Sequence, residues 1–406
     1  MRFTALAVLV FATLPLLRAA ELKSLDVSVE AGKFDRVNVP VRVAIDVPAG
    51  AKSATLKDAS GKTIPGQITA PSLLSTAAPD SRELVFILPS LKAGESATFK
   101  VSVSDATPEG TVFKWHDTPG DFTELKLSDR PILRYMYKAI DTSTPAARDL
   151  TYKVFHHLYD PAGTRLVTKG PGGKFPHHRG IYYGFKCTHN GKVSDTWHCT
   201  KETHLAHDKF LQSEEGPVLG RHRVIVKWVG IGNEHFANEE RELTVYNVPG
   251  GQMVEFASRL KGTTGTVKVG GDPQHAGFHF RADNEVSEKT AKQTYYIRPD
   301  GIGKPGETRN HPGNKDHVNL AFNAMSFVLG EKRYTCCYLD RAENPKEARF
   351  SERDYGRFGS YFETEFDDKK TLDVNYRLWF VEGELKQEEV AAKDNDFDAP
   401  VKATVK

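Results

Sequence analysis

Residues 34–47 read FDRVNVPVRVAIDV, and this stretch decides the fold class. From residue 37 on, every second side chain is apolar, so an extended chain places all of these side chains on one face. Further apolar runs follow at residues 84–88 and 97–103, with turn-forming Gly and Pro residues between them. Short strands at this spacing are typical of an all-β domain. The sequence therefore predicts a small immunoglobulin-like β-sandwich over residues 22–105.

The rest of the chain is also rich in predicted strands. Residues 111–384 show little helical periodicity and no repeat of about 20–50 residues that would indicate a solenoid or a propeller. We expect one large antiparallel β-sandwich there, joined to the first domain near residues 105–110, with a helical turn or two at residues 200–211. Residues 385–406 are charged and poor in apolar side chains, which predicts a short helix and a solvated C-terminal tail.

The composition excludes several classes of protein. The chain has 406 residues, of which 39% are hydrophobic and 27% charged, as expected for a globular protein with a sizeable core. Its 55 Lys and Arg residues nearly balance its 53 Asp and Glu residues, and the resulting net charge of +2 argues against nucleic acid as a partner. After residue 20 no apolar run approaches the ~20 residues that span a bilayer, so we expect no membrane span in the mature protein.

The N-terminus has the pattern of a secretory signal peptide. A positive charge at Arg2 precedes an apolar stretch at residues 3–17, and the small residues Ala19 and Ala20 follow it. We expect residues 1–20 to be removed on export, which places the mature protein in the periplasm or outside the cell.

Export permits disulfide bonds, but the four cysteines are not spaced to form them. Cys187 and Cys199 flank a strong hairpin signal at residues 190–191, yet they are out of register across that hairpin. Cys336 and Cys337 are adjacent, so in a strand they point to opposite faces. We therefore expect buried free thiols.

Histidine is the unusual residue type of this chain, with 15 copies that include three notable clusters. The first cluster, His177 and His178, ends the glycine-rich segment 169–180 ahead of a predicted strand. This segment lacks the spacing of a phosphate-binding loop, and no helix follows it. Adjacent side chains of an extended chain point to opposite sides, so both histidines can serve one pocket only if the backbone bends at Pro176.

The second cluster is the string Asp195-Thr-Trp-His198. The hairpin at residues 190–191 predicts that the strand carrying His198 pairs with the strand that follows His178, so the first two clusters should be neighbours. Trp197 is either a stacking platform for a sugar ring or an ordinary core residue.

The third cluster lies in residues 272–281, which read as a strand. The period of two places His275, His279 and Arg281 on one face and apolar side chains on the other. Two imidazoles and a guanidinium are costly to bury without partners, so this face predicts a polar pocket. Neutral imidazoles suit a metal ion, and the same groups suit acid–base chemistry on a sugar, with Arg281 neutralising an oxyanion or a carboxylate. The spacing alone does not decide between the two.

Together the three clusters resemble one known family. Gly170-Pro-Gly-Gly-Lys-Phe-Pro-His-His-Arg-Gly180, Asp195-Thr-Trp-His198 and His275-Ala-Gly-Phe-His-Phe-Arg281 are similar to strings of an uncharacterised bacterial family often labelled "methane oxygenase PmoA-like". The resemblance covers about residues 130–382 and implies a β-sandwich and a setting in carbohydrate catabolism. A membrane methane oxygenase needs several spanning helices, which this sequence lacks, so we do not expect methane oxidation. The residues that the resemblance singles out are His177, His178, Arg179, Trp197, His198, His275 and Arg281.

We expect the three clusters to converge on the site of an exported carbohydrate-active enzyme of the glycoside hydrolase, lyase or epimerase type. A divalent metal ion is a cofactor that the histidines suit, and a copper- or iron-dependent oxidase is a further option. The alternative is a noncatalytic glycan-binding protein that stacks sugars on aromatic rings. The expected residues are His177, His178, Arg179, His275 and Arg281 as catalytic groups, Trp197, Tyr182, Tyr183 and Lys174 as substrate contacts, and His198 and His279 as metal ligands.

Overall fold

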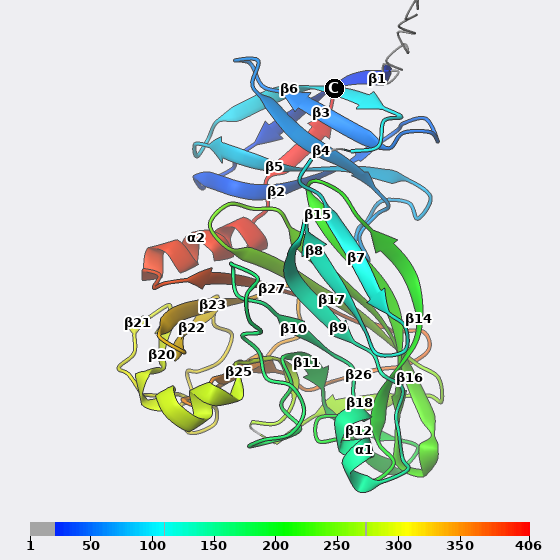
Figure 1. The fold of residues 1–406 in the computed structure, drawn as a ribbon, viewed down its shortest axis with the longest axis vertical. Helices are drawn as coiled ribbons and strands as arrows, with labels where there is room; N and C mark the ends of the chain where they lie inside the picture. The colour runs from blue at the N-terminus through cyan, green and yellow to red at the C-terminus, as the bar shows by residue number, and fades with distance from the viewer. Residues whose placement is uncertain (1–20, 109, 273) are drawn as a thin grey trace, which may run out of the picture.

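The computed structural model describes residues 21–108, 110–272 and 274–406. These residues form large antiparallel sheets with few helices, which confirms the predicted all-β, sandwich-like fold class. The predicted signal peptide, residues 1–20, lies outside the described residues. Figure 1 shows two stacked parts: a small part that contains the first strands of the chain, and a larger sandwich below it.

The small part is one seven-stranded sheet that closes around its own apolar core. Its strands are β1 (Glu21–Glu30), β2 (Arg36–Ile45), β3 (Ser53–Lys57), β4 (Thr63–Thr69), β5 (Arg82–Leu91), β6 (Ser96–Ser104) and β28 (Lys402–Val405). They are hydrogen-bonded in the order β2-β5-β4-β3-β6-β1-β28, and the two end strands also contact each other.

The larger part is built from sheets of eight, nine and four strands. The eight-stranded sheet has the order β24-β25-β19-β11-β10-β9-β8-β7, with β7 (Phe113–Thr118), β8 (Phe122–Leu127), β9 (Arg130–Met136), β10 (Phe155–Leu158), β11 (Ile181–Gly184), β19 (Gly277–Arg281), β24 (Arg349–Arg353) and β25 (Arg357–Tyr361). The nine-stranded sheet has the order β14-β15-β16-β17-β27-β23-β22-β20-β21, with β14 (His204–Glu214), β15 (Leu219–Val229), β16 (His235–Tyr246), β17 (Gln252–Gly262), β20 (Tyr295–Arg298), β21 (Gly301–Ile302), β22 (Phe322–Leu329), β23 (Lys332–Asp340) and β27 (Leu372–Glu382). The four-stranded sheet has the order β13-β12-β18-β26, with β12 (Lys186–His189), β13 (Lys192–Asp195), β18 (Val267–Gly270) and β26 (Thr364–Phe366).

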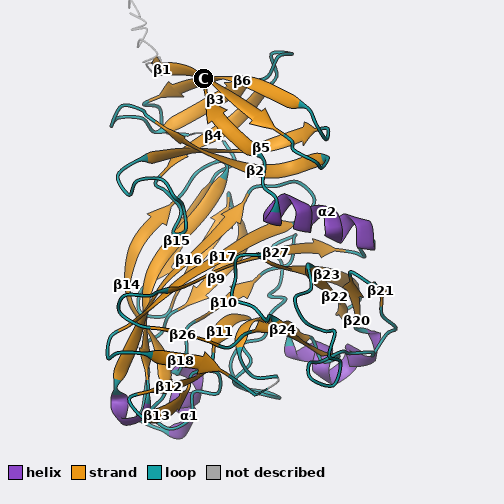
Figure 2. Cartoon of the chain, turned by 180° about the vertical axis from the view of Figure 1, so that it is seen from behind, coloured by secondary structure: helices purple, strands orange, loops and turns teal. Residues whose placement is uncertain are grey.

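Helices are few and short. In the part of the chain that the structure describes, the two α-helices are α1 (Pro145–Thr151) and α2 (Gln387–Asp398), and single helical turns lie at Ile231–Asn233, Val286–Thr290 and Ala291–Gln293. Seen from behind in Figure 2, α2 lies at the boundary between the small sheet and the sandwich.

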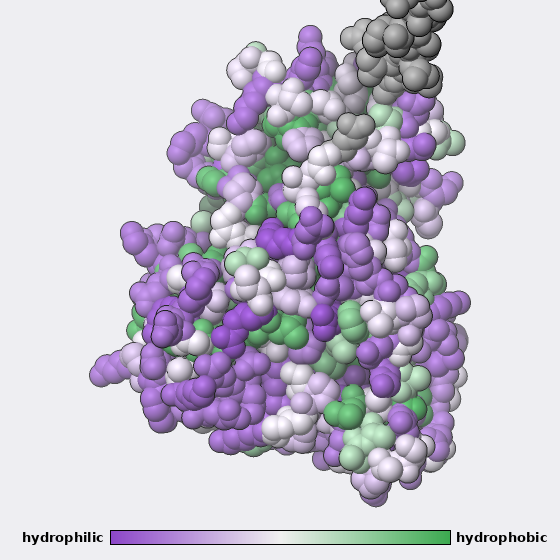
Figure 3. All heavy atoms as spheres, viewed as in Figure 1, coloured by the Kyte–Doolittle hydropathy of each residue, from purple (hydrophilic) through white to green (hydrophobic). Residues whose placement is uncertain are grey.

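The main core lies between the eight-stranded and nine-stranded sheets. Tyr183 of β11 and Phe278 of β19 point inward and meet Trp228 and Phe256 of the facing sheet. Each such ring contributes roughly 1.5–3 kcal/mol by leaving water. In the space-filling view of Figure 3, hydrophilic residues cover most of the visible surface of the sandwich. Because side chains alternate along a strand, the opposite face of β11 and β19 is left for other contacts.

Strand β2 has the alternation predicted for residues 39–45, but Val37 does not follow it. Asn38 has a φ of 55°, which is not an extended conformation, and it is left out of the pairing of β2 with β5 although the register is the same on both sides of it. The alternation is interrupted at this residue, and on its N-terminal side Val37 is 53% exposed and Arg36 is buried.

The C-terminal segment is not the solvated tail that its charge predicts. It forms α2 and then β28, which pairs with β1 in the first sheet. Its few apolar residues Val390 and Phe397 are fully buried. Arg36 forms a buried ion pair with Asp396 at 3.2 Å and donates to two carbonyl groups at the end of α2. The prediction is wrong because the partners of these residues are more than 300 positions away in the sequence.

Three other expectations can be compared directly with the structure. Residues 200–211 form no helical turns, because His204–Glu214 is the long strand β14. All four cysteines are buried and free, as predicted. No helix among the described residues is long and apolar enough to cross a membrane.

Replacing Arg36 with Met should lower the free energy of unfolding by about 3 kcal/mol, because Asp396 and two carbonyl groups then stay buried without their donor. The exposed Lys33→Met is the control and should change that free energy by less than about 0.5 kcal/mol. Urea denaturation followed by tryptophan fluorescence measures both. Equal stability of the two variants would show that Arg36 does not hold the C-terminal segment.

Candidate functional site

Three neighbouring strands of the eight-stranded sheet continue into the four-stranded sheet. β11 leads into β12, β18 into β19, and β25 into β26, in the same order in both sheets. The backbone packs closely at this transition: a side chain on Gly184 would meet the backbone of Thr196, and one on Gly277 would clash with the carbonyl group of Ser360. Gly277 also has a φ of 94°, a conformation that favours glycine. Loops that adjoin this transition carry the histidines.

The three histidine clusters meet, as predicted. The ring centroid of His177 lies 4.1 Å from that of His178 and 4.5 Å from that of His198. The ring of His275 lies 5.0 Å from His198, 6.1 Å from His177 and 6.2 Å from His178. His178 is buried and the other three histidines are partly exposed. The cluster therefore opens to solvent on one side and faces the interior on the other.

His198 and His275 reach this place from turns, not from the strand positions that were predicted for them. The pairing of β12 with β13 ends at Asp195, and β19 begins only after His275. Asp195 Oδ1 accepts backbone N–H bonds from Trp197 and His198, and Asp272 accepts one in the same way. These aspartates compete with strand pairing, which is why the predicted strands are shorter than expected.

The same two aspartates orient the histidines. Asp195 Oδ2 lies 2.8 Å from His198 Nδ1, and Asp272 Oδ1 lies 2.7 Å from His275 Nδ1. A carboxylate at Nδ1 favours the tautomer with the proton on that atom and leaves Nε2 with a free lone pair. Such an Nε2 can bind a metal ion or accept a proton. The spacing Asp-x-x-His occurs in both pairs, and this repeat is the sequence signal that could have identified them.

Lys153 connects the first two clusters and was not predicted from the sequence. Its ammonium group is 4% exposed and donates to the carbonyl groups of His177, at 3.2 Å, and of Trp197. Burial lowers the pKa of Lys153 to about 8. Because one side chain binds both loops, it holds His177 next to His198.

Arg179 positions the first loop and does not face the histidines. Its guanidinium group is fully buried and lies 3.9 Å over the ring of Tyr152. It donates to the carbonyl groups of Pro176, Leu150 and Asp149, the last two of which belong to α1. These contacts all lie within the protein framework and favour a positioning role, and the catalytic role of Arg179 stays a prediction.

Several ring nitrogens of the cluster are buried without a hydrogen-bond partner among the described residues. They are Nε2 of His177 and both ring nitrogens of His178. Burial lowers the pKa of both imidazoles, and the charge of Arg357 adds to this effect at His178. Burial also lowers the pKa of His275, although Asp272 opposes the shift. These imidazoles are neutral at pH 7, which is the form that binds metal ions.

His177, His178 and His275 fit a metal centre. One nitrogen atom from each lies within 4.8 Å of the others. Three protein ligands with an open position are typical of catalytic transition-metal sites, in which metal–nitrogen bonds are ~2.0–2.1 Å long. The unpartnered nitrogens of His177 and His178 and the aspartate behind His275 agree with this interpretation. His198 lies beside the group.

The ring of His279 is held by contacts within the protein. Its Nε2 lies 3.0 Å from the carbonyl oxygen of Ala276, and its Nδ1 lies 3.2 Å from Nη1 of Arg357. The residue is fully buried, and the ring of Trp197 covers it at 4.7 Å between centroids. Both nitrogens have partners within the protein, and the residue takes the predicted face of β19; its role as a metal ligand stays a prediction that these contacts do not favour.

The aromatic residues predicted to stack on a sugar are not exposed. Tyr183 lies in the main core, away from solvent, and its contact with a substrate stays a prediction that this burial does not favour. Tyr182 and Trp197 pack on each other at 4.8 Å and are at most 1% exposed, which leaves no ring face for stacking. They form the floor beneath His178 instead. Lys174 is exposed on the glycine-rich loop, and its contact with a substrate stays a prediction.

Arg281 belongs to the same floor. Its Nη1 donates to the carbonyl groups of Ala282, at 2.9 Å, and of Tyr355, while its Nε and Nη2 are buried without a partner among the described residues. Tyr355 lies beside Arg281 and also stacks, at 6.2 Å and 13°, against His178. Tyr355 lies in the turn between β24 and β25, and Arg357 is the first residue of β25. They were missed because a single Tyr or Arg in a charged turn carries no sequence signal.

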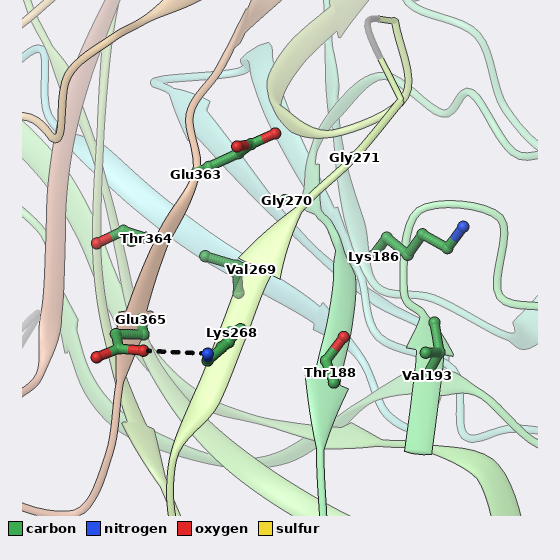
Figure 4. A pocket seen from close by; sticks show the side chains of 10 residues that line it. All are labelled: Lys186, Thr188, Val193, Lys268, Val269, Gly270, Gly271, Glu363, Thr364 and Glu365. Carbon is green, nitrogen blue, oxygen red and sulfur yellow. Dashed lines mark ion pairs between the residues drawn. The ribbon is translucent and has the colours of Figure 1, made fainter. Parts of the chain in front are cut away.

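A shallow groove lies next to the histidines on the outer face of the four-stranded sheet (Figure 4). The residues that line it are Lys186, Thr188, Val193, Lys268, Val269, Gly270, Gly271, Glu363, Thr364 and Glu365. Gly271 directly precedes Asp272, and Lys186 is paired with Asp195 across the hairpin. The groove thus ends beside both Asp–His pairs and offers a polar surface to an extended ligand.

Comparison with known proteins identifies a matching family and two distantly similar structures. The model of a family of unknown function (DUF6807) matches residues 123–394, which confirms the predicted uncharacterised family; the PmoA-like label stays a prediction. No curated protein matches the chain. An α-mannosidase from Enterococcus faecalis V583 is similar over 94% of this chain at 8% identity, with a TM-score of 0.48. A glycosyl hydrolase family 38 protein from Enterococcus faecalis is similar over 94% at 10% identity, with a TM-score of 0.46. The chain spans 46% and 47% of their lengths.

We expect the protein, purified without a nickel column, to contain a transition metal by elemental analysis. His178→Ala and His275→Ala should each lose it, because each removes a ligand. Asp272→Asn should weaken metal affinity about 10–100-fold, since His275 then lacks its orienting carboxylate. His116→Ala, at an exposed histidine of β7, is the control and should keep the metal. Native metal content in all three site variants would exclude this centre.

Proposed function

We propose a metal-dependent carbohydrate-active enzyme for this chain, which belongs to the family of unknown function DUF6807. The observation that carries the proposal is the group formed by His177, His178 and His275, whose nitrogen atoms lie within 4.8 Å of one another beside solvent. Three protein ligands leave a position open for a substrate. A divalent metal ion bound there would act as a Lewis acid on a substrate carbonyl or carboxylate oxygen.

The arrangement favours proton transfer, as in a lyase or an epimerase, over hydrolysis by two carboxylates. A glycoside hydrolase usually needs two free carboxyl groups across the scissile bond. Asp195 and Asp272 are both engaged by histidines. His198, oriented by Asp195 beside the three-histidine group, is suited to remove a proton from a carbon next to a carbonyl or carboxylate group.

Two reactions share this step. When His198 takes the proton, the electron pair of the C–H bond moves toward the carbonyl oxygen. In an epimerase, a proton returns to the opposite face of the same carbon. In a lyase, the C–O bond on the next carbon breaks, a C=C bond forms, and the leaving oxygen takes up a proton.

A noncatalytic glycan-binding protein is less well supported. Such a protein needs exposed rings, whereas Trp197, Tyr182 and Tyr183 are at most 1% exposed. A carbohydrate substrate is supported by the resemblance described above and by the polar groove that ends at the Asp–His pairs. Export to the periplasm or the medium is part of the proposal and is supported by the pattern of residues 1–20.

Incubation in D2O with a panel of ketosugars and uronates tests the proposed proton transfer. The metal-loaded protein should introduce deuterium at the carbon next to the carbonyl or carboxylate group, which NMR detects. His198→Gln should slow this exchange about 10²–10⁴-fold, because the base is removed, while the metal content stays unchanged. His116→Ala is the control. Cleavage of glycosides without deuterium incorporation, or full exchange by His198→Gln, would contradict the proposal.

A further inference from the structure

We propose that the buried floor beneath His178 binds a carboxylate group, so that the substrate is an acidic sugar of the uronate class. The floor consists of Arg281, Trp197 and Tyr182. The statement about the substrate rests on the proposed function, whereas the binding of a carboxylate does not depend on it.

Unpartnered donors are the first observation. Nε and Nη2 of Arg281, Nε1 of Trp197 and the hydroxyl group of Tyr182 have no partner among the described residues. The three residues are at most 1% exposed, so water outside the protein does not reach them. Guanidinium and indole N–H groups can only donate, and therefore the missing partner must be an acceptor. A buried polar group without a partner costs roughly 1–3 kcal/mol, which a bound acceptor would offset.

Unbalanced charge is the second observation. Other buried arginines of the sandwich have a carboxylate: Arg298 pairs with Glu352 at 2.6 Å, and Arg241 pairs with Glu239 at 2.7 Å. Within the described residues, Arg281 forms no ion pair. The same holds for the other buried cations around the histidines, which are Arg357, Arg179, Lys153 and Lys169. A buried charge is costly unless an opposite charge accompanies it, and the nearby carboxylates of Asp195 and Asp283 form no ion pair with these cations, so a bound anion would stabilise this region.

The residues of the floor lie close to His178 and to one another. Tyr182 lies 6.1 Å from His178 and 4.8 Å from Trp197, measured between ring centroids. The ring of Trp197 lies 5.8 Å from His178. The guanidinium carbon of Arg281 lies 5.1 Å from the ring of Tyr355, which stacks on His178. The proposal therefore places the carboxylate next to His178, within reach of the unpartnered donors of Arg281, Trp197 and Tyr182.

The cover of this position consists of two aromatic rings. Phe175 of the glycine-rich loop stacks on Tyr355 at 4.8 Å between centroids. Phe175 has a φ of 56°, an unfavourable conformation for a bulky residue, and the loop before it contains Gly172 and Gly173 at positive φ. Relaxation of this loop would move Phe175 away from Tyr355 and open a path from solvent to Arg281.

The test uses the full-length protein treated with a chelator, so that metal binding does not contribute. D-galacturonate should raise the melting temperature and bind saturably by calorimetry, whereas D-galactose, which lacks the carboxylate, should not. Arg281→Gln and the milder Trp197→Phe, which keeps the ring but removes the N–H donor, should each weaken galacturonate binding at least tenfold. The exposed Lys114→Gln is the control and should bind as the parent does.

Two results would overturn the carboxylate site: equal binding of galactose and galacturonate, or unchanged affinity in both floor variants. Equal binding of free acetate and galacturonate would overturn the assignment of the substrate to the uronate class. Trp197→Phe keeps the test decisive if Arg281→Gln does not fold. If galacturonate binds as expected but the metal-loaded enzyme exchanges no deuterium, the proposed proton transfer fails while the carboxylate site stands.

Discussion

The site depends on the close backbone packing where three strands pass from one sheet into the next. Gly184, Gly277 and Gly359 leave no room for a Cβ atom, because the neighbouring strand or turn occupies that place. A side chain at Gly277 would push β19 away from β25 and separate the turn of Asp272 from the turn of Asp195. The histidines come from turns that adjoin this transition. Main-chain contacts therefore position the turns of His198 and His275, and the side chain of Lys153 holds His177 beside His198.

Periodicity in the sequence predicts the strands well, but not the positions where strands end. The alternation of residues 39–45 appears in the structure because one face of that strand is buried, whereas residues 277–281 are buried on both faces. The positive φ of Asn38 and the turn at Asp195 interrupt the predicted patterns, since both depend on local backbone conformations that alternation does not encode. His279 has the predicted face but a structural role, because its partner Arg357 is 78 residues away in the sequence. Convergence of the histidines could be predicted, whereas the partners of each one could not.

In the part of the chain that the structure describes, buried cations at the site lack the carboxylate partners that buried arginines have in the rest of the sandwich. In the framework, buried arginines meet buried carboxylates, as in the pairs of Arg298 with Glu352 and of Arg241 with Glu239. At the site, Lys153 and Arg179 donate to carbonyl groups and form no ion pair within the described residues, and Arg281 is left with free donors. Carbonyl groups stabilise a cation less than a directly paired carboxylate does, so the region keeps a positive potential. A protein that maintains such a potential in its interior gains specificity for negatively charged ligands at the expense of stability.

This potential also links the two binding events that we propose. A divalent metal ion held by His178 would lie near Arg281 and Arg357, whose charges already disfavour protonation of that imidazole. The same repulsion opposes the metal ion, because it acts on any positive charge at this place. A carboxylate on the floor cancels part of the repulsion and so raises the affinity for the metal ion. Since coupling between two ligands is reciprocal, the metal ion must raise the affinity for the carboxylate by the same factor. Substrate and metal ion would then bind cooperatively, and a neutral sugar, which cannot relieve the repulsion, would be discriminated against even if it fitted the groove.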